Sequence, residues 1–173
     1  MTHVKTLVKG YVREEDDKIN ATSTTSLIDT GDLKVIVDPG MNRDMLLNGL
    51  ERTNLSPEDI DYVVLTHYHL DHSLLSGIFE NADVLDDGDI SSFNGDIKGH
   101  EGKVPGTDIE IIKTPGHARF HCSVLVKTQD RGNVFIAGEV VWSMDKEEKD
   151  MSKELILNRE DTYVKDEEAL EES

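Results

Sequence analysis

The sequence predicts a mixed domain of the α/β or α+β class. Two observations support this prediction. Short apolar segments with the two-residue period of strands recur between turn signals, and Met45, Leu46, Leu47 and Leu50 recur at helical spacing between Arg43 and Leu50. With 173 residues, the chain is long enough for one hydrophobic core, so we expect residues 1–173 to form a single domain.

Strands and turns are predicted for the first 40 residues. We expect a strand over Val4 to Arg13, an exposed turn over Glu14 to Lys18, and a second strand over Ala21 to Leu27, ending at Ile28. Thr30-Gly31-Asp32 then predicts a turn, Leu33 to Val37 a returning strand, and Asp38-Pro39-Gly40 its end.

The elements after the predicted helix over Arg43 to Leu50 follow from local signals. Ser56-Pro57-Glu58-Asp59 has the cap, proline and early carboxylate of a short helix start. A strand over Tyr62 to Leu65 and a helix beginning at Leu74 follow, with the helix N-terminus facing the loop between them. Later strands are predicted at Asp83 to Leu85, around Ile90 to Ile97, and at Ile109 to Lys113, Cys122 to Lys127 and Val134 to Ala137. Lys146 to Leu157 and Asp161 to Glu172 are helical candidates, and residues 158–173 read as an acidic helical tail.

A cluster of metal-ligand residue types follows the strand that ends at Leu65. His67, His69, Asp71 and His72 lie within six positions where this strand passes into a loop. Neutral imidazoles and carboxylates are the ligands of zinc-type ions, and His67 and His69 can project to the same side of an extended segment. Asp71 and His72 lie beyond the bend, so this segment can supply two adjacent metal sites. The isolated His3 is read as an ordinary histidine.

Two motifs resemble the metal motifs of the metallo-β-lactamase superfamily. His67-Tyr68-His69-Leu70-Asp71-His72 matches its His-x-His-x-Asp-His signature, and Thr114-Pro115-Gly116-His117 is similar to its second metal motif. The segments ending in Asp29-Thr30-Gly31 and Asp38-Pro39-Gly40 also resemble its N-terminal half, and the short loops resemble small single-domain members. The resemblance implies an αββα sandwich of two mixed β-sheets with flanking helices, and ligand loops gathered on one edge.

The resemblance also implies a set of ligands. It assigns His67, His69 and His117 to a first metal, and Asp71, His72 and a shared carboxylate to a second. Glu139 in Ala137-Gly138-Glu139 occupies the position of that carboxylate, where the superfamily usually has Asp. Its extra methylene is absorbed by the backbone, or it binds one ion only, or it points away from the site as a surface carboxylate. His121 is a weaker candidate for a supporting contact, and His100 is read as an ordinary histidine.

The sequence departs from the superfamily pattern near its C-terminus. Members generally continue to a Gly-His motif that completes the second metal site, whereas no histidine follows His121 here. The second ion is then under-coordinated, or another group replaces the ligand, or the chain is a shortened version of a longer parent. We expect a weak second site.

The composition limits which substrates, metal ligands and cellular locations we expect. The chain has 18 basic and 36 acidic residues, and its net charge of −18 argues against a nucleic-acid substrate. Cys122 is the single cysteine and opens an apolar run, so we expect a buried thiol, no internal disulfide and a metal site built from His, Asp and Glu. The sequence has no long apolar run and no secretory start, which predicts a cytoplasmic protein without a membrane span.

These patterns lead to three hypotheses about function. The first is a metallohydrolase that uses a metal-bound hydroxide on a small ester, thioester or amide, with Zn²⁺ as one or two ions, or with iron or manganese. Asp71 is the candidate catalytic residue, since it can orient the nucleophile and take part in proton transfer. The second is a phosphodiesterase or nuclease of the same fold. The third is a truncated, non-catalytic metal-binding domain, for which unpaired sheet edges make a homodimer plausible.

Overall fold

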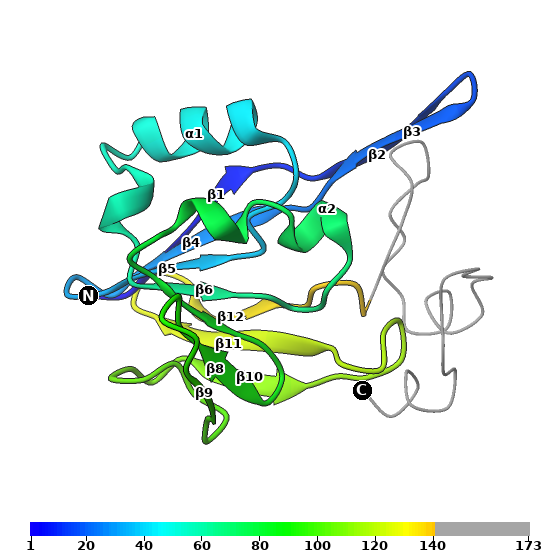
Figure 1. The fold of residues 1–173 in the computed structure, drawn as a ribbon. Helices are drawn as coiled ribbons and strands as arrows, with labels where there is room; N and C mark the ends of the chain where they lie inside the picture. Colours follow the sequence, from blue (N-terminus) through cyan, green and yellow to red (C-terminus); the bar gives the residue numbers. More distant parts are fainter. Residues whose placement is uncertain (141–173) are drawn as a thin grey trace.

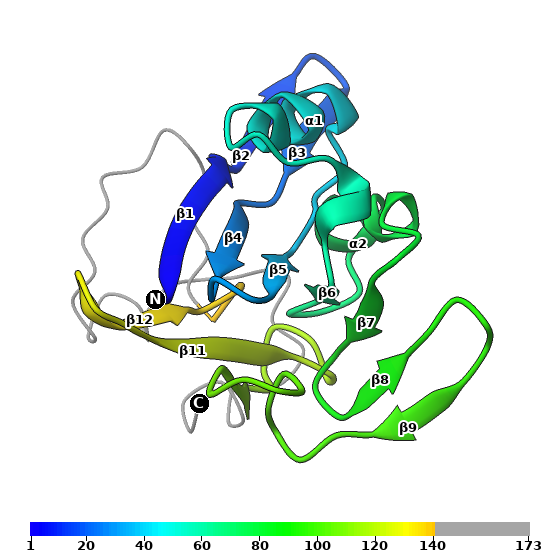
Figure 2. The ribbon, with the colours of Figure 1, turned by 90° about the vertical axis from the view of Figure 1, so that its left-hand side faces the viewer.

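A seven-stranded mixed sheet is the largest element of the computed structural model, which describes residues 1–140 of the chain. Its strand order is β1-β4-β5-β6-β7-β8-β9 (Figures 1 and 2). Strands β5, β6 and β7 pair in parallel and the outer strands pair antiparallel. The bounds are β1 His3–Val8, β4 Thr25–Asp29, β5 Lys34–Val37, β6 Tyr62–Val64, β7 Asp83–Leu85, β8 Asp89–Ser91 and β9 Ile97–Gly99.

A smaller antiparallel sheet lies against one face of the larger one (Figure 2). It contains β10 (Glu110–Lys113), β11 (Cys122–Thr128) and β12 (Gly132–Ile136). A separate hairpin of β2 (Tyr11–Glu15) and β3 (Lys18–Thr22) projects away from both sheets (Figure 1). The helical elements are α1 (Arg43–Glu51), η1 (Pro57–Asp59), α2 (Leu70–Ser73) and η2 (Ser76–Ile78).

The larger sheet separates two apolar clusters because successive side chains of a strand point to opposite faces. Val35 and Val37 of β5 pack with Val124 of β11 between the two sheets. Ile36, from the same strand, packs with Leu46 and Leu50 of α1 on the other face. The described part of the chain is therefore layered as helix, sheet and sheet.

This layering confirms the predicted fold class, with two differences. The smaller sheet is antiparallel over residues 1–140 rather than mixed, and in that range the helices lie on the outer face of the larger sheet. The predicted helices over 146–157 and 161–172, and the tail over 158–173, lie outside the described residues. None of the helices in residues 1–140 is long and apolar enough to cross a membrane.

Four of the predicted elements differ from the structure. The strand over Val4 to Arg13 is divided at Gly10, where an added Cβ would lie 2.5 Å from the backbone nitrogen of Thr24, so the close approach of a distant segment divides it. Similarly, the strand over Ala21 to Leu27 is two strands, β3 and β4.

The stretch from Ile90 to Ile97 is a hairpin, because the Asn94 side chain accepts the Asp96 N–H and turns the chain. In place of the helix predicted from Leu74, the chain forms only the 3-10 turn η2, and the helix α2 precedes it and contains Asp71 and His72.

Candidate metal centre

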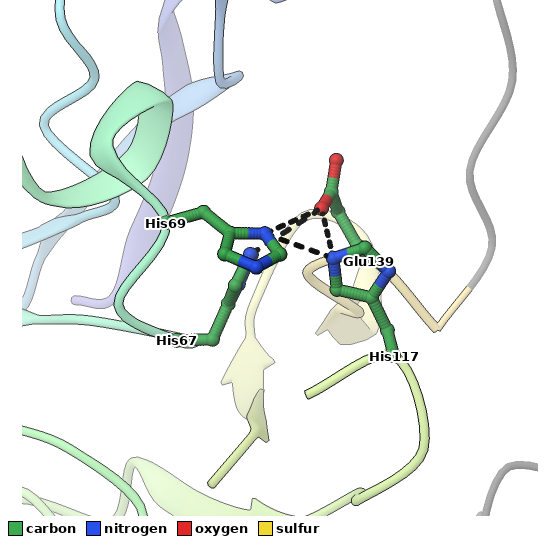
Figure 3. Close-up of side chains that lie close together, drawn as sticks. All are labelled: His67, His69, His117 and Glu139. Atoms are coloured by element: carbon green, nitrogen blue, oxygen red, sulfur yellow. Dashed lines mark hydrogen bonds and ion pairs between the residues drawn. The ribbon is translucent and has the colours of Figure 1, made fainter. Parts of the chain in front are cut away.

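The six predicted ligands come from four segments that meet at one end of the two sheets. His67 and His69 follow β6, and Asp71 and His72 lie in α2. His117 lies in the loop between β10 and β11, and Glu139 follows β12. Figure 3 shows His67, His69, His117 and Glu139 converging on one point. The structure therefore brings together residues that are up to 72 positions apart in the sequence.

Four of these side chains form a compact first group. One ligand atom from each of His67, His69, His117 and Glu139 lies within 4.8 Å of all the others. Glu139 Oε2 lies 2.7 Å from His117 Nε2, 3.3 Å from His67 Nε2 and 3.9 Å from His69 Nδ1. Ligand atoms around a tetrahedral zinc ion would lie about 3.4 Å apart, given bonds of about 2.0–2.2 Å. These separations bracket that spacing, so the cluster is suited to binding a metal ion.

A second group shares Glu139 with the first. It contains Asp71, His72 and Glu139, again with ligand atoms within 4.8 Å of one another. His72 Nε2 lies 3.6 Å from Glu139 Oε1 and 3.8 Å from Asp71 Oδ2. Oε2 of Glu139 thus faces the first group, and Oε1 faces the second. Of the alternatives that the sequence left open for Glu139, the structure does not place it at the surface: its carboxylate points inward between the two groups.

Asp38 supports the second group through His72, a role that the sequence did not predict. The buried carboxylate accepts hydrogen bonds from Thr66 N (2.8 Å) and Thr66 Oγ1 (2.8 Å) and pairs with His72 Nδ1 (2.9 Å). Asp38 has a φ of 51°, an uncommon left-handed conformation for a residue other than glycine. By holding Nδ1 of His72, it directs Nε2 of that ring toward Glu139. Its sequence signals were an acidic residue at the end of a buried strand and the resemblance of Asp38-Pro39-Gly40 to the superfamily.

Neighbouring side chains in the cluster shift one another's pKa values. Burial would raise the pKa of Glu139, but contacts with His117, His67 and His72 lower it far below its ordinary value. Burial would lower the pKa of His72, but Asp38 and Glu139 raise it to about 10. Burial and the neighbouring His67 and His117 lower the pKa of His69. The first group therefore offers an ionised carboxylate together with a neutral His69, the forms in which these residues bind metals.

His67 provides an independent test of whether the cluster fits a metal. Its side chain is buried, and Nε2 makes no hydrogen bond within residues 1–140 although it faces the centre of the first group. A buried polar atom without a hydrogen-bond partner is costly, and such atoms usually have a functional explanation. A cation bound in the first group would accept the lone pair of His67 Nε2.

The two motif loops are also joined through their backbones. The N–H of Cys122 donates to the C=O of Thr66 (2.8 Å), which links the start of β11 to the segment just after β6. His67 follows Thr66 and His121 precedes Cys122, so this bond fixes both loops next to the cluster. As predicted, Cys122 is buried, and burial raises the pKa of its thiol.

The remaining three histidines are His3, His100 and His121, and only His121 contacts the predicted ligand set. His3 is exposed near Asp130, and His100 bonds to the C=O of Asp86. His121 is buried and contacts the backbone N–H of Glu139. Burial and the neighbouring His67 lower the pKa of His121 to about 4.

A cleft of about 430 Å³ opens beside the second group. Asp71, His72 and Glu139 line it, together with Tyr11 and the segment 22–24. Its walls combine hydroxyl-bearing and apolar side chains, so a small molecule could reach the cluster from this side.

Comparison with known proteins places these features in a family context. Residues 21–84 match the family model described as the metallo-beta-lactamase superfamily. The chain is 31% identical over 182 residues to metallo-beta-lactamase domain-containing protein 1 of Xenopus laevis, covering 93% of this chain and 77% of that protein.

Two further similarities differ in extent. A Bacillus N-acyl homoserine lactonase is 26% identical over 125 residues, covering 62% of this chain but only 49% of the lactonase. The crystal structure of a Thermotoga maritima protein described as a metallo-beta-lactamase superposes with a TM-score of 0.69 at 27% identity, covering 80% of this chain and 79% of the other. The chain thus spans most of two relatives and about half of the third.

Proposed function

Because the chain belongs to the metallo-β-lactamase superfamily, we propose that it is a metal-dependent hydrolase of small ester, thioester or amide substrates. The observation that carries this proposal is the convergence of His67, His69, His117 and Glu139 within 4.8 Å. Three imidazoles and one carboxylate from three separate loops have no other evident structural purpose at one end of the sheets.

The chain would hold two ions with different ligand sets. His67, His69 and His117 would hold the first, Asp71 and His72 the second, and Glu139 would lie between them. A bound divalent ion would supply Lewis acidity and lower the pKa of a coordinated water toward neutrality. We propose zinc for this donor set, although iron and manganese accept the same ligands.

Asp71 is the residue that we propose for proton transfer. Its side chain is 26% exposed, whereas those of Asp38 and Glu139, which also line the cleft, are 3% and 12% exposed. Its backbone C=O accepts a hydrogen bond from Ser23 N (2.8 Å), which fixes the helical turn that carries it. Asp71 can therefore orient a water molecule in the cleft and accept its proton.

The cleft favours an uncharged carbonyl substrate. Thr22, Ser23 and Thr24 contribute neutral polar groups to its wall, and Arg131 is the single Lys or Arg among residues 1–140 that lines it. The guanidinium of Arg131 already bonds to the C=O of Val4 and pairs with Asp130. The related lactonase is named for a cyclic ester substrate, which supports the ester class.

A phosphodiesterase or nuclease receives less support from the same features. A nucleic-acid backbone needs several cations along its path, and the net charge is −18. The non-catalytic alternative rests on the second site, where the described residues supply three ligands. We therefore keep it as the outcome expected if metal binds but no substrate is turned over.

Elemental analysis combined with a substrate panel tests the proposal. We expect the purified protein to retain at least one equivalent of metal and to hydrolyse one or more esters, thioesters or lactones. His67→Ala should lose most of the metal, whereas His3→Ala, which removes an exposed imidazole outside the cluster, should retain it. Less than one equivalent of zinc, iron or manganese, together with no hydrolysis beyond a chelated control, would contradict the proposal.

A cytoplasmic location, a single domain and a homodimer stay predictions. Sedimentation of the full chain would test the homodimer directly.

A further inference from the structure

A closed relay of hydrogen bonds lies behind Glu139, outside the predicted ligand set. The backbone N–H of Glu139 donates to His121 Nε2 (3.1 Å). His121 Nδ1 lies 2.8 Å from Thr114 Oγ1, which lies 2.9 Å from Ser123 Oγ. Ser123 Oγ donates to the C=O of Ala137 (3.0 Å). The relay thus begins and ends on the same turn, Ala137-Gly138-Glu139.

Two backbone groups fix the direction of every bond in this relay. The Glu139 N–H can only donate, so His121 Nε2 must accept and the ring proton must lie on Nδ1. The Ala137 C=O can only accept, so Ser123 must donate to it and accept from Thr114. Thr114 then accepts from His121 Nδ1. A neutral His121 with its proton on Nδ1 is the only form that satisfies all four bonds.

The relay leaves the turn little freedom. His121 is 1% exposed, and Thr114 and Ser123 are also buried. Gly138 has a φ of 62°, and an added Cβ would lie 2.7 Å from His121 Nε2. The imidazole therefore packs directly against the backbone of the turn while bonding to its last N–H. Any shift of the ring would move the residue that carries the shared carboxylate.

We propose that His121 is a positioning residue that sets the Glu139 carboxylate between the two ligand groups. This inference rests on the proposed metal function, because its consequence is a preorganised ligand. His121 itself does not need to touch the metal: its Nε2 is occupied by the Glu139 N–H and its Nδ1 by Thr114. Partners that orient a ligand in this way typically change metal affinity by about 10–100-fold when they are removed.

A matched pair of substitutions tests the role of the Nε2 acceptor. His121→Leu fills a similar volume without an acceptor, whereas His121→Gln can present its amide oxygen to the Glu139 N–H. We expect His121→Leu to weaken zinc binding by about 10–100-fold in competition with a chromophoric chelator, and His121→Gln to restore most of it. Wild-type affinity in His121→Leu, or equal losses in both variants, would overturn the inference.

Thr128→Val controls for a general loss of stability. Thr128 Oγ1 donates to the C=O of Gly132 (2.9 Å) at the opposite end of the β11–β12 hairpin. Its loss should lower the melting temperature and leave zinc affinity unchanged. If His121→Leu does not fold, Thr114→Val breaks the relay without changing the ring and should weaken zinc binding in the same direction. Unchanged affinity in Thr114→Val would count against the relay.

A double-mutant cycle tests whether His121 acts through Glu139. In the Glu139→Ala background, His121→Leu should cause no further loss of zinc affinity, because the side chain that it positions is gone. An equal additional loss in that background would show that His121 acts by another route and would overturn the inference. If Glu139→Ala binds zinc like the wild type, Glu139 is not a ligand, and the positioning role falls while the three-histidine site stands.

The protonation of His121 provides a readout that requires no metal. Long-range proton–nitrogen NMR spectra of the metal-free protein, assigned by comparison with His121→Gln, should show neutral His121 with its proton on Nδ1 at pH 7. A proton on Nε2, or a doubly protonated ring, would break the bond to the Glu139 N–H and refute the relay. This result does not depend on whether the protein binds zinc, so it separates failure of the inference from failure of the proposed function.

Discussion

Replacing Gly138 by alanine should disturb both stability and metal binding. Gly138 has a φ of 62°, and an added Cβ would lie 2.7 Å from His121 Nε2 and 2.8 Å from Thr66 Cβ. The left-handed conformation costs a residue with a Cβ roughly 1–2 kcal/mol. Forcing a methyl group into a packed site costs about 1–3 kcal/mol more. We therefore expect Gly138→Ala to lower the free energy of unfolding by about 2–5 kcal/mol.

Gly132 provides the matched control for this prediction. It has a φ of 69°, and no described heavy atom lies within 4 Å of the position that its Cβ would take. Gly132→Ala should therefore lower the free energy of unfolding by roughly 1–2 kcal/mol, the cost of the left-handed backbone alone. The difference between the two variants isolates the crowding against His121 and Thr66.

Urea unfolding and zinc competition measure the two effects. A stability loss for Gly138→Ala no greater than that for Gly132→Ala would show that the site accommodates the methyl group, and the steric reasoning would be wrong. A clear stability loss with unchanged zinc affinity would show that the turn does not control the position of Glu139.

Three further predictions concern the supporting carboxylate, pH and metal removal. Asp38→Asn should lower the free energy of unfolding by about 3–5 kcal/mol in urea titrations, because it removes the charge paired with buried His72; a loss below that of a typical surface variant would contradict this. Since the pKa of His72 is raised to about 10, a second ion must displace its proton, so second-ion affinity should rise about tenfold per pH unit from pH 7 to 9. In the metal-free protein, the raised pKa of His72 stabilises the folded state. This contribution to the free energy of unfolding is fully present below pH 6.5 and is lost as pH rises through about 10. Calorimetry across this range tests the affinity, and a flat profile would show that binding of the second ion displaces no proton from His72. Chelation of zinc held at about 100 times its Kd should remove about 2.7 kcal/mol of stabilisation, visible as a melting temperature lower by roughly 5–11 °C; an unchanged melting temperature would indicate that no ion binds the folded state.

Local patterns predicted the elements that local forces determine. The apolar spacing from Arg43 to Leu50 gave α1 to within one residue, and the cap at Ser56 marked the η1 turn. The motif resemblance grouped the imidazoles of His67, His69 and His117, which the structure brings together.

Features that depend on distant segments could not be predicted in this way. The break at Gly10 follows from the close approach of Thr24, and the left-handed Asp38 is held by Thr66 and His72, which lie 28 and 34 residues later in the chain. The orientation of Glu139 was open for the same reason, because the ring that holds its backbone lies 18 residues earlier in the chain. Local sequence patterns do not reveal such contacts between distant segments.

The hydrogen bond between Cys122 N and Thr66 O has a consequence for how the chain unfolds. It is one of the polar links between the two layers, as is the bond from Arg131 to the C=O of Val4, whereas the packing between the layers is apolar. An ion held by His67 from one layer and His117 from the other would add a further link beside this hydrogen bond. Separation of the layers would then require loss of the ion, and the exchange of the Cys122 amide hydrogen with solvent would report how tightly they are held.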